Sequence, residues 1–213
     1  MVEIVHPVLI VALALNFVAL GVSRIRAVVH AVAYQGILLG ILPLAVHLEF
    51  GMRTILLVIV TIAIKGFVIP AFLFRAMREA NIQHEVKPVL NYMSSLLFGA
   101  VGTGFALVFS YTLPLADERS HQLLVPASLA TVWCGFLMLT TRKKAIMQVL
   151  GYLILENGIY VFGLLLLKAL PVLVEVGVLL DLFTGVFVMG IIIFHINREF
   201  SSISTDHLAD LKE

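Results

Sequence analysis

The sequence carries little charge for its length. Of its 213 residues, 13% are Asp, Glu, Lys or Arg, whereas soluble domains contain about 25%. Basic and acidic residues almost balance, and the formal net charge of +1 gives no field that would attract nucleic-acid phosphates. With 61% hydrophobic residues, this composition excludes a water-soluble globular domain, a disordered tail, a coiled coil and a nucleic-acid binder.

Cysteine is almost absent as well. The one cysteine, Cys134, excludes an internal disulfide and any cysteine-ligated cluster on this chain. The seven histidines are scattered, and none forms a pair with metal-ligand spacing within one predicted element. We therefore expect no cofactor, no metal and no catalytic residue on the chain itself.

The first residues lack the features of a cleavable signal. The stretch 1–6 contains Glu3 and no lysine or arginine, whereas a signal peptide needs a positive segment before its apolar core. Arg24 and Arg26 follow the first apolar run instead. We expect this run to be a retained first membrane span.

Long apolar runs are what the sequence has in abundance, and its mean hydropathy is +1.09. A spanning helix takes about 20 apolar residues, and the runs between polar breaks predict seven spans. They are Pro7–Val22, Ala27–Leu48, Thr54–Phe74, Val89–Leu113, Leu123–Thr141, Ala145–Leu167 and Val172–Ile196. The predicted fold class is all-α, a polytopic membrane helix bundle of about seven transmembrane helices.

The distribution of lysine and arginine predicts the orientation of these spans. Ten basic residues fall on one side of the predicted membrane and three on the other, with Lys65 inside a span. Basic residues are enriched in cytoplasmic loops. We therefore expect the N-terminus outside the cell and the C-terminus in the cytoplasm.

A faint internal repeat relates the first three spans to the last three. Tyr34 and Tyr152 each follow a basic joint at the same spacing, and Lys65 and Asp181 each place a charge near the middle of a third span. Parallel repeats of this kind occur in membrane proteins. The repeat predicts a three-helix unit in residues 1–88, a spacer helix with an external loop in 89–122, and a second three-helix unit with a cytoplasmic tail in 123–213.

Ionisable residues inside the predicted spans are the candidate functional residues. Counting about 1.5 Å per residue from the span ends places Lys65, Glu156 and Asp181 near the middle of a hydrocarbon core about 30 Å thick. Glu175 lies a few residues inside the last span. A buried charge costs roughly 2.5–3.5 kcal/mol and usually marks an ion or proton path.

Two interpretations of these charges remain open. Lys65 could form a purely structural ion pair with either acid. Alternatively, two acids and one base leave a carboxylate that can exchange a proton near neutral pH, as a proton relay requires. Pro70 favours the second interpretation, because it cannot donate a backbone hydrogen bond to the turn that carries Lys65.

Particular residues of the last spans resemble those of a known family. These are the stretch Gly151–Gly158, which includes Glu156, and Leu173–Gly177 followed by Asp181, together with the tail 203–212. They resemble component E of the hydrogenase-4 complexes, the HyfE family, as does Lys65 followed by Pro70. The resemblance extends over the whole length, and its most specific residues lie between Arg142 and Glu213.

The last three spans also resemble NuoK, the three-helix subunit of respiratory complex I. On that match Glu156 takes the place of the middle-helix glutamate and Asp181 that of the last-helix glutamate, with a shorter side chain. The resemblance implies a non-catalytic membrane-arm subunit of an energy-converting [NiFe]-hydrogenase that moves protons or sodium. The implied relay residues are Glu156, Asp181, Lys65 and Glu175.

The resemblance also implies where the chain works and with what. It places the chain in the prokaryotic cytoplasmic membrane, among lipid, beside antiporter-like (NuoL/M/N-like) and NuoH-like membrane subunits. The NiFe centre and the iron–sulfur clusters are expected on partner subunits, including the peripheral hydrogenase subunits. A subunit of a multi-subunit cation/proton antiporter, and a structural spacer of the membrane arm, remain alternatives.

Overall fold

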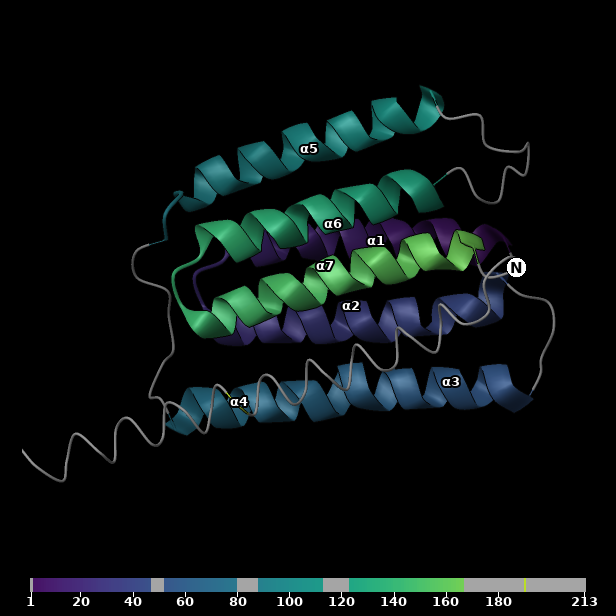
Figure 1. The fold of residues 1–213 in the computed structure, drawn as a ribbon, viewed down its shortest axis with the longest axis horizontal. Coiled ribbons are helices and arrows are strands. Elements are labelled where there is room, and N and C mark those ends of the chain that lie inside the picture. The colour runs from purple at the N-terminus through teal and green to yellow at the C-terminus, as the bar shows by residue number, and fades with distance from the viewer. Residues whose placement is uncertain (1, 47–51, 80–87, 113–122, 167–189, 191–213) are drawn as a thin grey trace, which may run out of the picture.

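The computed structural model describes residues 2–46, 52–79, 88–112, 123–166 and 190, and every element in these ranges is helical. Figure 1 shows the helices running side by side along one common direction. Their bounds are α1 Val2–Gly21, α2 Ile25–Val46, α3 Met52–Ala63, the π-helical turn η1 Ile64–Val68, α4 Ile69–Glu79, α5 Tyr92–Thr112, α6 Leu124–Thr141 and α7 Ala145–Leu166.

Six of the seven expected spans fall on these helices, which confirms the all-α membrane fold class. Each is long and apolar enough to cross a membrane, and α3, η1 and α4 together make up one of them. The first helix begins at Val2 rather than at Pro7, because its helical hydrogen bonding already includes the residues that precede the predicted apolar run. The expected seventh span, Val172–Ile196, lies outside the described residues except for Gly190.

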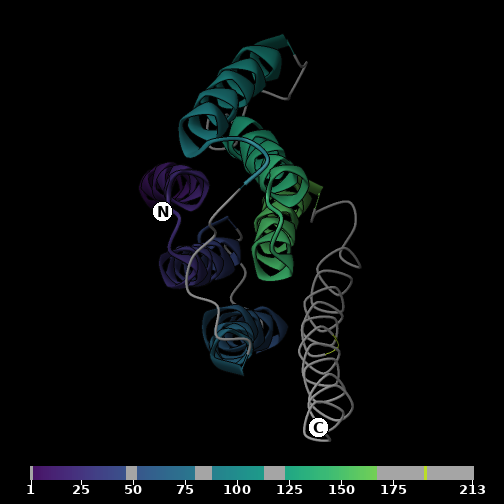
Figure 2. The same cartoon turned by 90° about the vertical axis from the view of Figure 1, so that its left-hand side faces the viewer.

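Four helices, α1, α2, α6 and α7, make up the middle of the described bundle. Figures 1 and 2 show α5 on the far side of α6 and the α3–α4 span on the far side of α2. Two apolar clusters fill the interior, and the larger joins α1, α2, α4, α6 and α7. The charged centre of the α3–α4 span therefore faces α2 and α7.

The contact between α6 and α7 depends on glycines. A Cβ atom on Gly135 would lie 2.3 Å from the backbone nitrogen of Leu155, and one on Gly151 would lie 2.7 Å from that of Leu139. A Cβ atom on Gly158 would lie 2.6 Å from the backbone nitrogen of Val132. Small residues let membrane helices approach closely enough for their backbones to touch, and this contact fixes how α7 presents its polar residues.

Among the basic residues expected on the cytoplasmic side of the membrane, those that the structure describes lie at one end of the bundle. The end of α1, the start of α2, the end of α4 and the α6–α7 joint all lie at the left of Figure 1. Arg142 at this joint is 1% exposed, donates a hydrogen bond to the carbonyl of Leu20 and lies over the Tyr92 ring. It therefore caps the C-terminal end of α1, where a cation is favourable.

The basic end should face the cytoplasm. Cysteines introduced at Thr112 and Lys143, exposed positions at opposite ends of the bundle, test this in intact cells with a membrane-impermeant maleimide. We expect labelling at position 112 and none at 143 until the cells are permeabilised. The native Cys134 is fully buried and serves as the unlabelled control, and equal labelling of both sites would contradict the orientation.

Candidate functional site

Lys65 lies near the midpoint of the α3–α4 span, in a turn that is wider than an α-helical one. The N–H of Ile69 bonds the carbonyl of Ile64, five residues back, and Pro70 has no N–H to offer. Such π-helical turns occur frequently at functional sites. The wider turn Ile64–Val68 thus lies directly before Ile69 and Pro70.

A glycine on α2 makes room for this lysine. A Cβ atom on Gly36 would lie 2.8 Å from the Cβ atom of Lys65, a distance that real side chains do not reach. Because Gly36 has no side chain, the Lys65 stem passes close to the α2 backbone towards α7. The residue as a whole is only 8% exposed.

On α7, Lys65 meets two adjacent polar residues. Its Nζ lies 3.1 Å from Oε1 of Glu156 and donates a hydrogen bond of 2.9 Å to Oδ1 of Asn157. The Tyr160 ring, one turn further along α7, has its centre 5.4 Å from the same nitrogen. Glu156 and Asn157 are both buried, so the ammonium group is held in the interior by a carboxylate, an amide oxygen and an aromatic face.

Buried amides continue from Asn157 across the bundle. Nδ2 of Asn157 donates to Oε1 of Gln35 on α2 at 3.2 Å, and Nε2 of Gln35 donates to Oδ1 of Asn16 on α1 at 2.8 Å. Nδ2 of Asn16 then donates to Oγ1 of Thr131 on α6 at 3.0 Å. We call Asn157, Gln35, Asn16 and Thr131 the amide chain.

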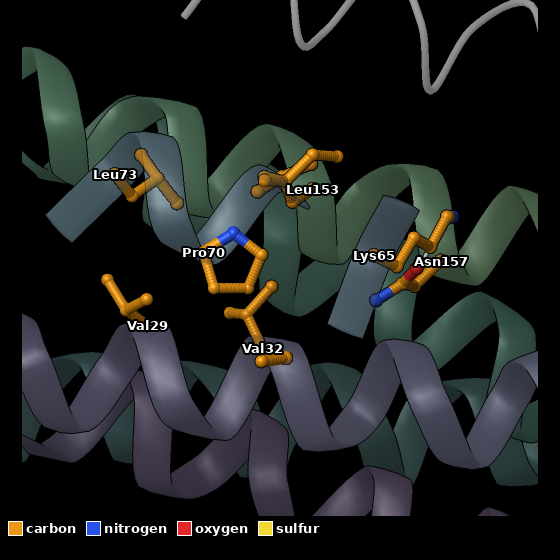
Figure 3. Close-up of a pocket in the computed structure, with 9 residues that line it drawn as sticks. Val29, Val32, Lys65, Pro70, Leu73, Leu153 and Asn157 are labelled. Atoms are coloured by element: carbon orange, nitrogen blue, oxygen red, sulfur yellow. Dashed lines mark hydrogen bonds between the residues drawn. The ribbon is translucent and has the colours of Figure 1, made fainter. Parts of the chain in front are cut away.

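A small cavity adjoins the pair. It has a volume of about 10 Å³, close to the smallest that admits one water molecule. Figure 3 shows Lys65 and Asn157 at one end of it and Val29, Val32, Pro70, Leu73 and Leu153 around the rest. Three of these lining residues, Val29, Leu73 and Leu153, lie nearer than the Lys65–Glu156 pair to the basic end of the bundle. The cavity therefore extends from the pair towards that end.

The structure brings together Lys65 and Glu156, two of the four candidate relay residues. Asp181 and Glu175 lie outside the described residues. Sequence reasoning missed Asn16, Gln35 and Thr131. The signal that would have found the first two is a lone amide within an apolar span, because a buried amide needs hydrogen-bond partners and therefore points to other buried polar groups.

The arrangement suits proton exchange. An ammonium donor and a carboxylate acceptor lie in direct contact, beside a cavity of the size of one water molecule and among apolar side chains. In such surroundings a proton transfer between them converts a charged pair into a neutral amine and a neutral acid. A change of charge nearby alters the relative energies of the charged and neutral pairs strongly, because the interior has a low dielectric constant.

These features define the class of the protein: a multi-pass membrane helix bundle with a buried lysine–glutamate pair near the middle of two spans. The chain is 34% identical over 194 residues to the uncharacterized protein Rv0085 of Mycobacterium tuberculosis, covering 89% of this chain and 87% of that protein. It belongs to the same family as Rv0085.

A more distant similarity connects the chain to a hydrogenase. It is 30% identical over 100 residues to hydrogenase-4 component E of Escherichia coli, and the match covers 47% of this chain and 45% of that protein. The similarity thus supports a relationship to a hydrogenase membrane subunit over about half the chain, less than the whole length expected from the sequence. No model of a known protein family and no solved structure matches the chain.

Proposed function

We propose that the chain is a membrane-arm subunit of an energy-converting complex of the [NiFe]-hydrogenase type, and that Lys65 and Glu156 move protons within it. The contact of 3.1 Å between Lys65 Nζ and Glu156 Oε1, buried near the middle of two spans, carries the proposal. Ionisable groups at this depth are expensive and usually mark ion paths. The similarity to hydrogenase-4 component E supports the type of complex.

The proposed step is a proton transfer between the two side chains. An N–H bond of the Lys65 ammonium breaks as an O–H bond forms on Glu156, and the reverse transfer restores the ion pair. Redox work on partner subunits would supply the change in local charge that drives the exchange. The cavity beside Lys65 favours protons over sodium, because it has room for about one water molecule and none for a hydrated metal ion.

The partners and cofactors of the proposal lie outside this chain. Antiporter-like and NuoH-like membrane subunits would cover its charged faces, and the NiFe centre and iron–sulfur clusters would be held by peripheral subunits. Asp181 and Glu175 remain predicted relay residues of the last span. The prokaryotic cytoplasmic membrane is the proposed location.

Purification through a tag on this chain tests the proposed assembly. From membranes solubilised in mild detergent, we expect mass spectrometry to find a [NiFe]-hydrogenase large subunit and iron–sulfur subunits in constant ratio to the tagged chain. The control is an equally abundant, unrelated membrane protein with the same tag. A long-lived monomer, or a complex that contains only antiporter subunits, would contradict the proposal.

A further inference from the structure

The proton proposed to move between Lys65 and Glu156 does not pass through the amide chain, yet the amide chain joins four helices to the pair. We infer that Gln35 is a positioning residue: with Asn16, it holds the Asn157 amide so that the oxygen of Asn157 faces the Lys65 ammonium group. The inference rests on the proposed function, because it assigns Gln35 a part in the same step.

Two contacts fix the direction of the hydrogen bonds in the amide chain, one at Asn157 and one at Gln35. Lys65 has only donors, so it requires an oxygen from Asn157. At Gln35, Nε2 also donates to the backbone carbonyl of Ala12, at 3.2 Å. A backbone carbonyl can only accept a hydrogen bond, so it turns the Gln35 amide with its nitrogen towards α1 and its oxygen towards α7.

Each link then determines the next. Because the oxygen of Gln35 faces α7, it accepts from the nitrogen of Asn157 at 3.2 Å. The oxygen of Asn157 is thereby left on the Lys65 side, where it accepts at 2.9 Å. A reversed Asn157 amide would place two donor groups against each other at Lys65 and two acceptor oxygens against each other at Gln35.

The amide chain orients Lys65 but does not conduct protons. Asn and Gln amides donate from nitrogen and accept at oxygen, and they do not ionise near neutral pH. A proton on Lys65 therefore has Glu156 and the adjoining cavity as its route, not α1. When Glu156 takes up a proton, Asn157 still offers the lysine an uncharged acceptor, so the distance between the two partners is kept for the return step.

A double-mutant cycle on the intact complex tests whether Gln35 acts through Asn157. The complex is reconstituted into liposomes, energised with an artificial low-potential electron donor, and assayed for protons pumped per electron with a pH-sensitive dye. We expect Gln35→Met and Asn157→Leu each to lower this ratio several-fold. We expect Gln35→Met to have no further effect in the Asn157→Leu background, because its target is already gone.

If Gln35 had a purely structural role, the losses of pumping in Gln35→Met and Asn157→Leu would multiply in the double variant. Such multiplication would overturn the inference, and so would an unchanged pumping ratio in Gln35→Met.

Should Gln35→Met fail to assemble, variants of Thr131 provide the test. Thr131→Val should lower the pumping ratio while Thr131→Ser keeps it. The control is Ser128→Ala, which removes a buried hydroxyl bonded to Val125 of its own helix, and it should pump like the parent. Equal pumping by Thr131→Val and by this control would overturn the inference.

The Lys65→Met variant separates this inference from the proposed function. If Lys65→Met pumps as well as the parent, the proposed function itself is wrong. If Lys65→Met loses pumping while the two single variants multiply in the cycle, only the positioning role of Gln35 is wrong.

Discussion

Replacing Glu156 by glutamine should leave the complex assembled while proton pumping falls to a small fraction of the parental rate. Breaking a buried ion pair costs about 3–5 kcal/mol in soluble proteins when a charge is left without a partner. Here Asn157 and the new amide oxygen still accept from Lys65, so most of this cost should be avoided. A glutamine cannot take up and release the proton, so pumping stops even though the site keeps its shape.

The measurement compares electron transfer with pumping in the same preparation. Electron transfer to an artificial acceptor should survive better than pumping does. Glu3→Gln makes the same chemical change in the first turn of α1, far along the chain from the pair, and should pump like the parent. Parental pumping by Glu156→Gln would show that Glu156 is not a relay residue.

Replacing Gly135 by alanine should remove most of the folded protein from the membrane. The new Cβ atom would lie 2.3 Å from the nitrogen and 2.6 Å from the Cα atom of Leu155. A backbone cannot move aside as a side-chain end can, so α6 and α7 must separate. Overpacking of ordinary cores already costs about 1–3 kcal/mol, and separation of α7 would also pull Glu156 away from Lys65.

Gly104 on α5 provides the matched control. A Cβ atom there meets nothing within 4 Å among the described residues, so Gly104→Ala should keep the parental level. Membrane abundance by immunoblot and the melting temperature in detergent measure both variants. If Gly135→Ala is as abundant and as stable as Gly104→Ala, the close approach of α6 and α7 does not hold in the membrane.

The spans could be predicted from the sequence because their signal is local. A run of about 20 apolar residues has few alternatives to a spanning helix, and four of the six described spans lie within about three residues of their predicted bounds at both ends. The third ends five residues later than predicted, at Glu79. The first begins earlier, at Val2. Which helices touch could not be predicted, because spans of similar composition pack through small features. Gly135, Gly151 and Gly158 are common residues whose importance appears only when α6 lies against α7.

The candidate site was predicted in part for the same reason. Depth along a span follows from counting residues, so Lys65 and Glu156 could be placed at similar depth. Their contact depends on the rotation of two helices about their axes, and the sequence left either acid open as the partner of Lys65. Gln35 and Asn16 have uncharged side chains and give a weaker signal, although the structure connects both to Asn157.

The turn at Lys65 shows how much of the local structure a single proline, Pro70, predicts. Pro70 predicts a missing hydrogen bond, since proline has no N–H. A missing bond can be accommodated by a kink, a water molecule or a wider turn, and the sequence does not choose among them. The wider turn Ile64–Val68, with Gly36 opposite, is a property of the packed helices.

Pumping by the Lys65→Met, Glu156→Gln double variant is the most direct test of a relay at this pair. The double change removes both ionisable groups and leaves methionine beside two amides, so no buried charge of the pair remains to hinder assembly. If the pair moves protons, the complex should assemble, transfer electrons to an artificial acceptor and fail to pump. An assembled double variant that pumps at the parental rate would show that Lys65 and Glu156 only hold the helices together.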